Sequence, residues 1–212
     1  MVQYLEVQYF HPCLSTMYAE AFAYLENLDE QPYIPIVINS YGGYTDCLNV
    51  LLDLIQESSK PVITIVSGVA MSCGLGLAIS GTKGLRIVGP NATCLLHQVS
   101  SMAWGKASDI EAENKEIQRL NGVLAYKLYD KAGGHEEGFT KNLIKENFNA
   151  DLYLTPEQMI EYGWADKIIS INKALLNLDN IFDDYKKMEE VVELSDELNP
   201  MLRLNDKEVE NV

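Results

Sequence analysis

The chain has 212 residues, 47% of them hydrophobic and 22% charged, which suits a globular protein with a sizeable core. Its formal net charge of −15 argues against binding a nucleic-acid backbone, because such binding needs clustered Lys and Arg side chains. No apolar run approaches the roughly 20 residues of a membrane span. The N-terminus lacks the basic and apolar regions of a signal peptide, so we expect a cytoplasmic protein.

The four cysteines, Cys13, Cys47, Cys73 and Cys94, include no C-x-x-C pair. A zinc or redox site therefore has little support, and no metal site is expected. We expect free, buried thiols in a reducing compartment.

Short apolar runs alternate with helical patterns in the first half of the chain. Strands are predicted over residues 34–38, 62–66, 85–88 and 93–96. Between the first two strands, leucines and Ile55 recur at helical spacing, with Thr45 or Asp46 as the N-cap. Small residues over 70–80 predict a buried helix. The alternation favours an α/β fold with parallel strand pairing.

The second half of the chain contains the longest predicted helix, over 108–132. A sequence resembling a capping box opens it at residues 108–111, and Gly133-Gly134 ends it. The mixed residues 99–106 before it form a predicted extended arm. Shorter helices are predicted over 138–147 and 156–162, the latter because Pro156 suits a first helical turn.

The C-terminal segment differs in composition from the rest. From residue 179 onward, eleven acidic residues face four basic ones. Such a segment is either a solvated, partly helical or disordered extension, or an interaction tail. We therefore divide the chain into a domain over 1–178 and an acidic extension over 179–212.

Three features carry groups suited to catalysis or ligand binding. Gly42-Gly43 follows a predicted strand, so its backbone N–H groups can approach a ligand, although a tight turn explains it equally well. Ser72 follows another strand, where a serine is either a nucleophile on a turn or a simple helix start. His97 follows the strand predicted over 93–96 and is either a general base or a structural histidine. Together they indicate acyl transfer, which also needs a carboxylate. The candidates for that carboxylate are Asp46, Asp53, Asp109, Glu111, Asp130, Asp151 and Asp166.

Several ordered motifs from about residue 15 to residue 170 resemble the ClpP family, the proteolytic subunits of the Clp protease. Residues 38–43 (INSYGG) are similar to its I-N-S-P-G-G, with Tyr41 in place of the usual Pro. Residues 68–74 (GVAMSCG) resemble its G-x-A-A-S-M-G. Pro90-Asn91 followed by His97-Gln98 resembles its P-N-x-x-x-x-x-H-Q. Residues 151–155 (DLYLT) and 161–166 (EYGWAD) resemble its D-x-[FWY]-[ML]-[ST] and E-Y-G-x-x-D.

The resemblance implies a role for each matching residue. Ser72 would be the nucleophile, His97 the general base and Asp151 the orienting carboxylate. The backbone N–H groups of Gly43 and Cys73 would form the oxyanion hole. The expected substrate-binding residues are Gly42, Gln98 and Ser100.

The resemblance also implies a fold and an assembly. The fold would be the ClpP/crotonase α/β type, with ββα-type repeats and a projecting handle helix over 108–132. Subunits would form a homo-oligomeric ring, heptameric in the family, and handles would pair two rings into a chamber that cuts unfolded proteins and peptides without a cofactor. The chain begins later than the family pattern, so a Clp-type AAA+ ATPase partner is less expected. The alternatives are a ring peptidase working without an ATPase, a non-catalytic ring subunit, and a crotonase-type acyl-CoA enzyme.

Overall fold

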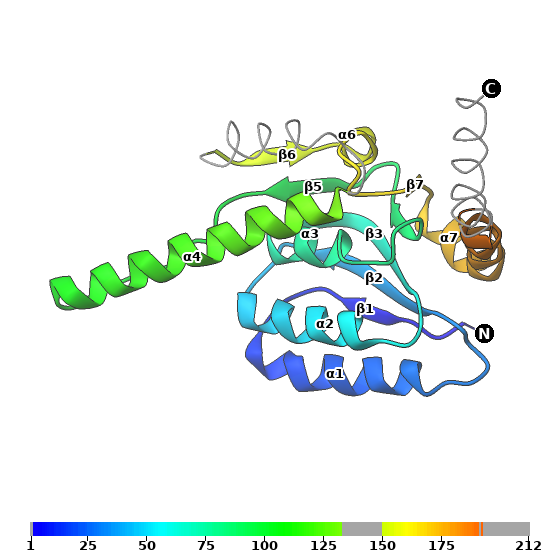
Figure 1. Ribbon diagram of the computed structural model, residues 1–212, viewed down its shortest axis with the longest axis horizontal. Helices are drawn as coiled ribbons and strands as arrows, with labels where there is room; N and C mark the ends of the chain where they lie inside the picture. Colours follow the sequence, from blue (N-terminus) through cyan, green and yellow to red (C-terminus); the bar gives the residue numbers. More distant parts are fainter. Residues whose placement is uncertain (1, 133–149, 191, 193–212) are drawn as a thin grey trace, which may run out of the picture. The chain divides into compact units, whose positions relative to one another are not determined.

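The computed structural model describes residues 2–132, 150–190 and 192. The chain divides into two compact units, Met1–Leu175 and Leu176–Val212. The first is a mixed α/β unit (Figure 1), and in the second residues 178–190 are helical. The helix predicted over 138–147 lies outside the described residues, as does most of the acidic extension.

A seven-stranded sheet forms the centre of the first unit within the described residues. The strands are β1 (Leu5–Val7), β2 (Ile34–Ser40), β3 (Val62–Met71), β4 (Arg86–Val88), β5 (Thr93–Leu96), β6 (Leu152–Leu154) and β7 (Lys167–Ile168). Their order is β1-β2-β3-β4-β7, while β5 pairs with β3 and β6 pairs with β5. All neighbours are parallel except β5 and β6, which are antiparallel. The α/β class and the parallel pairing expected from the sequence are thereby confirmed.

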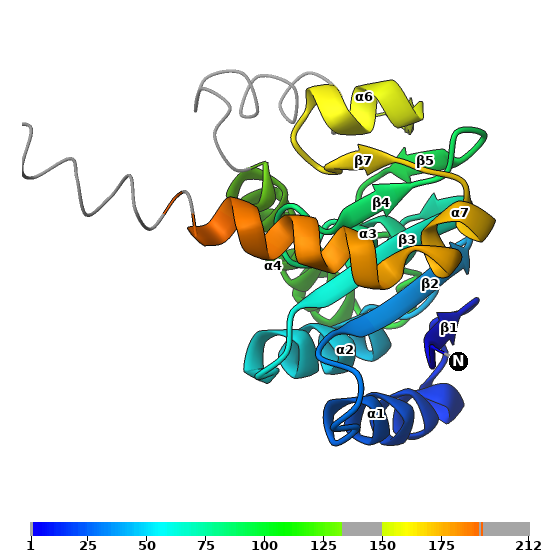
Figure 2. The ribbon, with the colours of Figure 1, turned by 90° about the vertical axis from the view of Figure 1, so that its right-hand side faces the viewer.

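The sheet branches at the long strand β3. Its first part pairs with β4 at Thr64–Val66, and its last part pairs with β5 at Val69–Met71. The first five residues of β2 and of β3 are all buried, which is typical of parallel strands. Figure 2 shows β2, β3, β4 and β7 twisting across the unit.

Six named helices accompany these strands in the described part of the chain. They are α1 (Pro12–Glu26), α2 (Thr45–Glu57), α3 (Cys73–Ala78), α4 (Ala107–Lys131), α6 (Pro156–Glu161) and α7 (Ile171–Leu176). The helices expected near 48–55, 108–132 and 156–162 are confirmed as α2, α4 and α6. None of the helices described is long and apolar enough to cross a bilayer.

Some local expectations are wrong. The N-cap of α2 is Tyr44, so Thr45 and Asp46 lie in the first turn. The helix expected over 70–80 begins only at Cys73, because Ala70 and Met71 still pair with β5. The long helix α4 begins before the predicted capping box. There, Asp109 Oδ2 accepts a hydrogen bond from the backbone N–H of Lys106 at 3.3 Å.

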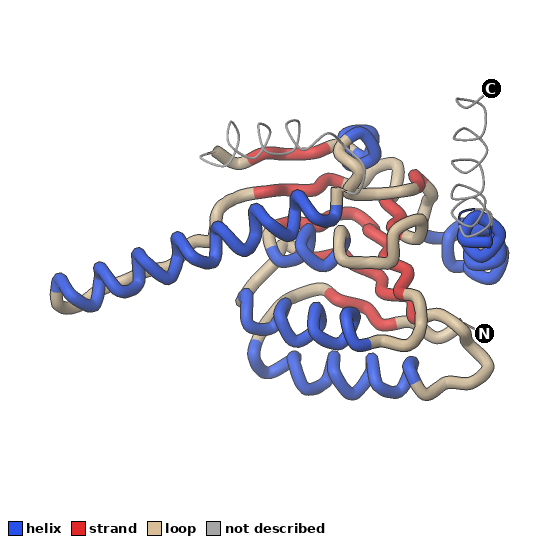
Figure 3. Tube along the Cα trace, viewed as in Figure 1, coloured by secondary structure: helices blue, strands red, loops and turns tan. Residues whose placement is uncertain are grey.

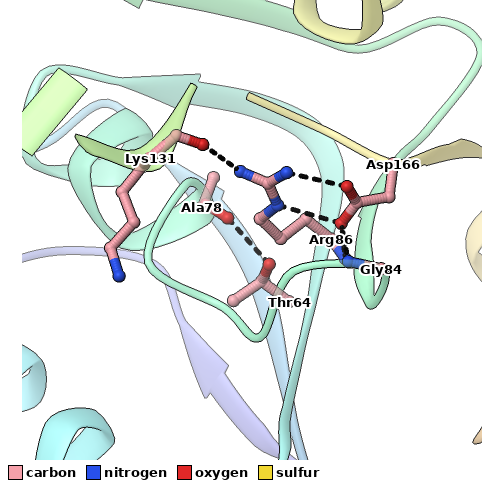
Figure 4. A network of polar contacts seen from close by, with 6 residues as sticks. All are labelled: Thr64, Ala78, Gly84, Arg86, Lys131 and Asp166. Carbon is pink, nitrogen blue, oxygen red and sulfur yellow. Dashed lines mark hydrogen bonds and ion pairs between the residues drawn. The ribbon is translucent and has the colours of Figure 1, made fainter. Parts of the chain in front are cut away.

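A buried polar network fixes the C-terminal end of α4 to the sheet (Figure 4). The Arg86 side chain is 3% exposed and binds Asp166 through Nε and Nη2, at 2.9 and 2.7 Å. Arg86 Nη1 also donates to the carbonyl oxygen of Lys131 at 2.8 Å. One turn earlier in the helix, Trp164 Nε1 donates to the carbonyl oxygen of Leu128 at 2.9 Å. The carbonyl groups of Lys131 and Leu128, near the end of the helix, thus each accept a hydrogen bond from a side chain.

The arm over 99–106 runs beside α4 as a loop (Figure 3). The backbone N–H of Val99 donates to Asn121 Oδ1 at 2.8 Å, and Ser101 Oγ donates to Glu113 Oε1. These two bonds hold the arm against the helix. The far part of α4 extends beyond the sheet, as the handle helix was expected to do (Figure 1).

Candidate active site

Ser72 lies on the sharp turn between β3 and α3. Its backbone has φ 55° and ψ −119°, and it is the one non-glycine residue with positive φ among the described residues. The turn is fixed by two hydrogen bonds, from Ser72 N–H to the Leu95 carbonyl at 3.0 Å and from Gly76 N–H to the Ser72 carbonyl at 3.1 Å. A serine held in a strained strand-to-helix turn projects its hydroxyl away from the backbone, as in a nucleophile elbow.

Gly42 and Gly43 pass directly beside this turn. A Cβ added to Gly42 would lie 3.3 Å from Ser72 Oγ and 2.7 Å from Ser72 Cβ, so only glycine permits this approach. A parallel bridge with Phe10 fixes the pair from the other side. In this bridge Phe10 N–H donates to the Gly42 carbonyl at 3.1 Å, and Tyr44 N–H donates to the Phe10 carbonyl at 2.8 Å.

The backbone N–H groups of Gly43 and Cys73 are available as donors. Neither has an acceptor within the described part of the chain, and Cys73 opens a helix, where N–H groups lack intrahelical partners. Cys73 Sγ lies 3.2 Å from the Gly43 carbonyl oxygen, to which it donates a hydrogen bond. This bond ties the two segments together. Burial raises the pKa of the Cys73 thiol to about 11, so the group stays protonated and keeps its donor role.

A pocket joins these groups to His97. Its lining includes Ser72, Cys73, Gly43 and His97, together with Gln98 and Ser100 from the arm. Ser72 and His97 are half-buried, so both are accessible from this pocket. The expected site residues Gly43, Ser72, Cys73, His97, Gln98 and Ser100 therefore meet in one place. Gly42 lies behind Ser72 and does not line the pocket.

Asp151 stands apart from the pocket lining and is exposed. No hydrogen bond joins Ser72, His97 and Asp151 among the described residues. The antiparallel register nevertheless relates two of them, since Leu95 pairs with Tyr153 and Leu96 with Leu152. The ladder ends there, and its continuation by one step would set His97 opposite Asp151. Directly opposed residues in such a pair have Cβ atoms about 5 Å apart.

The other carboxylates considered from the sequence lie elsewhere. Asp166 binds Arg86, so its carboxylate is already engaged. Asp46 and Asp53 lie on α2, and Asp109, Glu111 and Asp130 lie on α4. None of them lines the pocket.

Sequence reasoning missed most of the pocket wall. The wall residues beyond those expected are Thr45, Leu48, Asn49, Leu75, Gly76, Leu96, Val99, Leu120, Val123, Leu124, Lys127 and Leu128. Leu120, Leu124 and Leu128 recur at four-residue spacing, which indicates one apolar helix face but not what that face covers. No sequence motif or pattern marked Phe10, which fixes the glycine pair.

A serine on a strained turn, a histidine in the same pocket and unpaired N–H donors beside them are the groups expected in a serine hydrolase. No group of three or more His, Cys, Asp or Glu residues suited to a metal ion occurs in the described ranges. The four cysteines are free, and Cys13 is exposed rather than buried as expected.

Comparison with known proteins narrows the class. Residues 7–172 match the family model described as Clp protease. The chain is 36% identical over 148 residues to the ATP-dependent Clp protease proteolytic subunit 3 of Synechococcus sp. (strain CC9605), covering 69% of this chain and 72% of that protein. Subunits of the same name from Synechococcus sp. (strain CC9902) and Parasynechococcus marenigrum (strain WH8102) are each 35% identical over the same shares. The chain belongs to the Clp protease family and is a serine-type endopeptidase of the ClpP type.

Proposed function

We propose that this subunit hydrolyses peptide bonds of unfolded proteins and peptides through a triad of Ser72, His97 and Asp151. The observation that carries the proposal is the shared pocket of Ser72 and His97, with the Gly43 and Cys73 N–H groups beside the serine. The register of β5 and β6 supports Asp151 as the third member.

The chemistry follows from these positions. His97 takes the proton of Ser72 Oγ as the oxygen attacks the scissile carbonyl carbon. The N–H groups of Gly43 and Cys73 donate to the oxyanion of the tetrahedral intermediate. His97 then delivers its proton to the leaving amine, and a water hydrolyses the acyl-enzyme by the reverse sequence. Asp151 holds the imidazole tautomer and stabilises the imidazolium.

We also propose that the subunit works as a homo-oligomeric ring that encloses these sites, heptameric and paired through α4. Family membership supports this, since ClpP-type subunits assemble into rings. The exposed apolar side chains of the arm and of α4 support it too, because Met102 is 93% and Trp104 90% exposed. A Clp-type ATPase stays the less expected partner, and the four free thiols fit the cytoplasm.

The direct test is the Ser72→Ala variant. We expect kcat/KM for a fluorogenic peptide to fall by on the order of 10⁴-fold or more, because the nucleophile is gone. Labelling of the protein by a fluorophosphonate should disappear with it. Asp151→Asn should keep the labelling site but slow both reactions, since the imidazole loses its orienting carboxylate.

Ser108→Ala is the matched control, because Ser108 is exposed at the start of α4 and its hydroxyl bonds only Asp109 among the residues described. It should leave hydrolysis and labelling unchanged. Labelling of Ser72→Ala at the wild-type rate would contradict the assignment. A short peptide and a folded tagged protein, each with and without a Clp ATPase, separate ATPase-dependent from independent action.

A further inference from the structure

Lys127 is among the residues that line the pocket of Ser72 and His97. It is the one Lys or Arg among the described residues that line this pocket. The neighbouring wall from α4 is apolar and consists of Leu120, Val123, Leu124 and Leu128. The pocket thus combines an apolar wall with a single basic group.

The ammonium group has no partner of its own in the ranges described. Its side chain is half-buried and forms neither an ion pair nor a hydrogen bond there. Burial lowers the pKa of Lys127, the carboxylate of Asp53 on α2 acts to raise it, and the positive charge of Lys131 acts to lower it. Asp53 is exposed and lies outside the ion-pair distance, so it leaves the charge largely uncompensated. A half-buried ammonium group without a close counter-ion is stabilised when an anionic group binds beside it.

We propose that Lys127 makes the subunit select substrates with an acidic side chain, above all Glu, at the residue whose carbonyl Ser72 attacks. This inference rests on the proposed peptidase function. That residue is the one whose side chain lies nearest the nucleophile, and the pocket beside Ser72 receives it. A Glu side chain has two methylene groups to contact Leu124 and Leu128 and a carboxylate to meet Lys127 Nζ.

The opposing possibility is physically distinct. A lysine can cover an apolar wall with its methylene groups while its ammonium group stays in water. In that case a substrate side chain contacts only apolar groups in the pocket, and the subunit prefers Leu to Glu. The two cases differ in the effect of removing the charge while keeping the stem.

The test uses the whole chain and three fluorogenic peptides that differ only at the residue before the cleaved bond, which is Glu, Gln or Leu. We expect wild-type kcat/KM to favour Glu over Gln on the order of tenfold, as for a hydrogen bond to a charged group. Lys127→Met keeps the length of the stem and removes the charge. It should bring the Glu-to-Gln ratio to about one or below, with the Leu peptide still cleaved.

Lys115→Met is the matched control, because Lys115 lies on α4 outside the pocket, with a side chain 72% exposed. It removes the same charge and should leave the Glu-to-Gln ratio unchanged. Equal cleavage of the Glu and Gln peptides by the wild type, or a Glu preference that survives in Lys127→Met, overturns this inference alone. Failure of the wild type to cleave any of the three peptides overturns the proposed function and this inference with it.

Discussion

Ser72 holds a conformation that L-residues rarely adopt, and such a residue costs about 1–3 kcal/mol of folding free energy. The hydrogen bonds with Leu95 and Gly76 hold Ser72 in this conformation. The strain is useful at this position, because it separates the side chain from the strand and helix on either side. The close passage of Gly42 behind the serine is the second condition for the geometry.

Gly42→Ala tests this packing. The new Cβ would meet Ser72 Cβ at 2.7 Å and the Met71 carbonyl oxygen at 2.9 Å, at a φ of +105°. We expect peptide hydrolysis to fall on the order of 100-fold, because a shift of about 1 Å at a reacting group has such an effect. Stability, measured by urea unfolding, should fall by about 1–3 kcal/mol.

Gly122→Ala is the control for the glycine substitution. It lies within α4, and an added Cβ there meets nothing within 4 Å. It should raise stability by up to about 1 kcal/mol and leave hydrolysis intact. Unchanged hydrolysis in Gly42→Ala would mean that the serine turn tolerates displacement and that its observed geometry is not required.

At the scale of the elements, α4 depends on contacts at its C-terminal end. Of its 25 residues only Leu128 is fully buried, so the helix has little core of its own. Arg86 and Trp164 compensate by donating to the carbonyl groups of its last turns. Since the same end supplies Leu124, Lys127 and Leu128 to the pocket, these bonds also position the pocket wall.

Arg86→Met should destabilise the protein by about 3 kcal/mol, because removing one partner of a buried pair leaves Asp166 with an uncompensated charge. Urea unfolding measures this, with assembly held constant by working at one protein concentration. Arg119→Met removes an exposed pair with Glu116 and should change stability by less than about 1 kcal/mol. Similar losses in both variants would refute the role given to the Arg86 network.

The sequence predicted the elements that have a strong local signal. Strands over 62–66 and 93–96 and helices α2, α4 and α6 follow from apolar runs, spacing and Pro156. Strand β1, with three residues, and β7, with two, are too short for periodicity to reveal, and only pairing in the sheet defines them. The shift of Ala70 and Met71 from helix to strand has the same cause, because pairing with β5 overrides local preference.

The residues of the candidate site also divide into those with a local sequence signal and those that only tertiary packing reveals. Ser72, His97, Gly43 and Cys73 were predicted from motifs and meet in one pocket. Lys127 and Phe10 were not, because their roles depend on which distant segments pack together. Asp151 stays a prediction, supported by strand register alone.

At the scale of the whole molecule, the arm and α4 expose an apolar surface. Its members with large exposed fractions are Met102, Trp104, Ile110, Val123 and Tyr126. Single exposed apolar residues are ordinary, but several along one arm and helix are typical of a surface that other subunits cover. This agrees with the assembly proposed above.

Trp104→Ser combined with Met102→Ser should weaken assembly, because two nearly fully exposed apolar side chains would no longer be buried between subunits. Sedimentation velocity should show smaller particles than the wild type at equal concentration. Met188→Ser changes an exposed apolar residue of the second unit and serves as the control. Identical particle sizes for all three proteins would show that this surface takes no part in assembly.

The pairing of β5 with β6 has a consequence for synthesis. Residues 152–154 must leave the ribosome before they can pair with 94–96, some 58 residues after the earlier strand has emerged. A nascent chain that already carries Ser72 and His97 therefore still lacks the aspartate of the proposed triad. The order of synthesis thus keeps the proposed triad incomplete until most of the domain has been made.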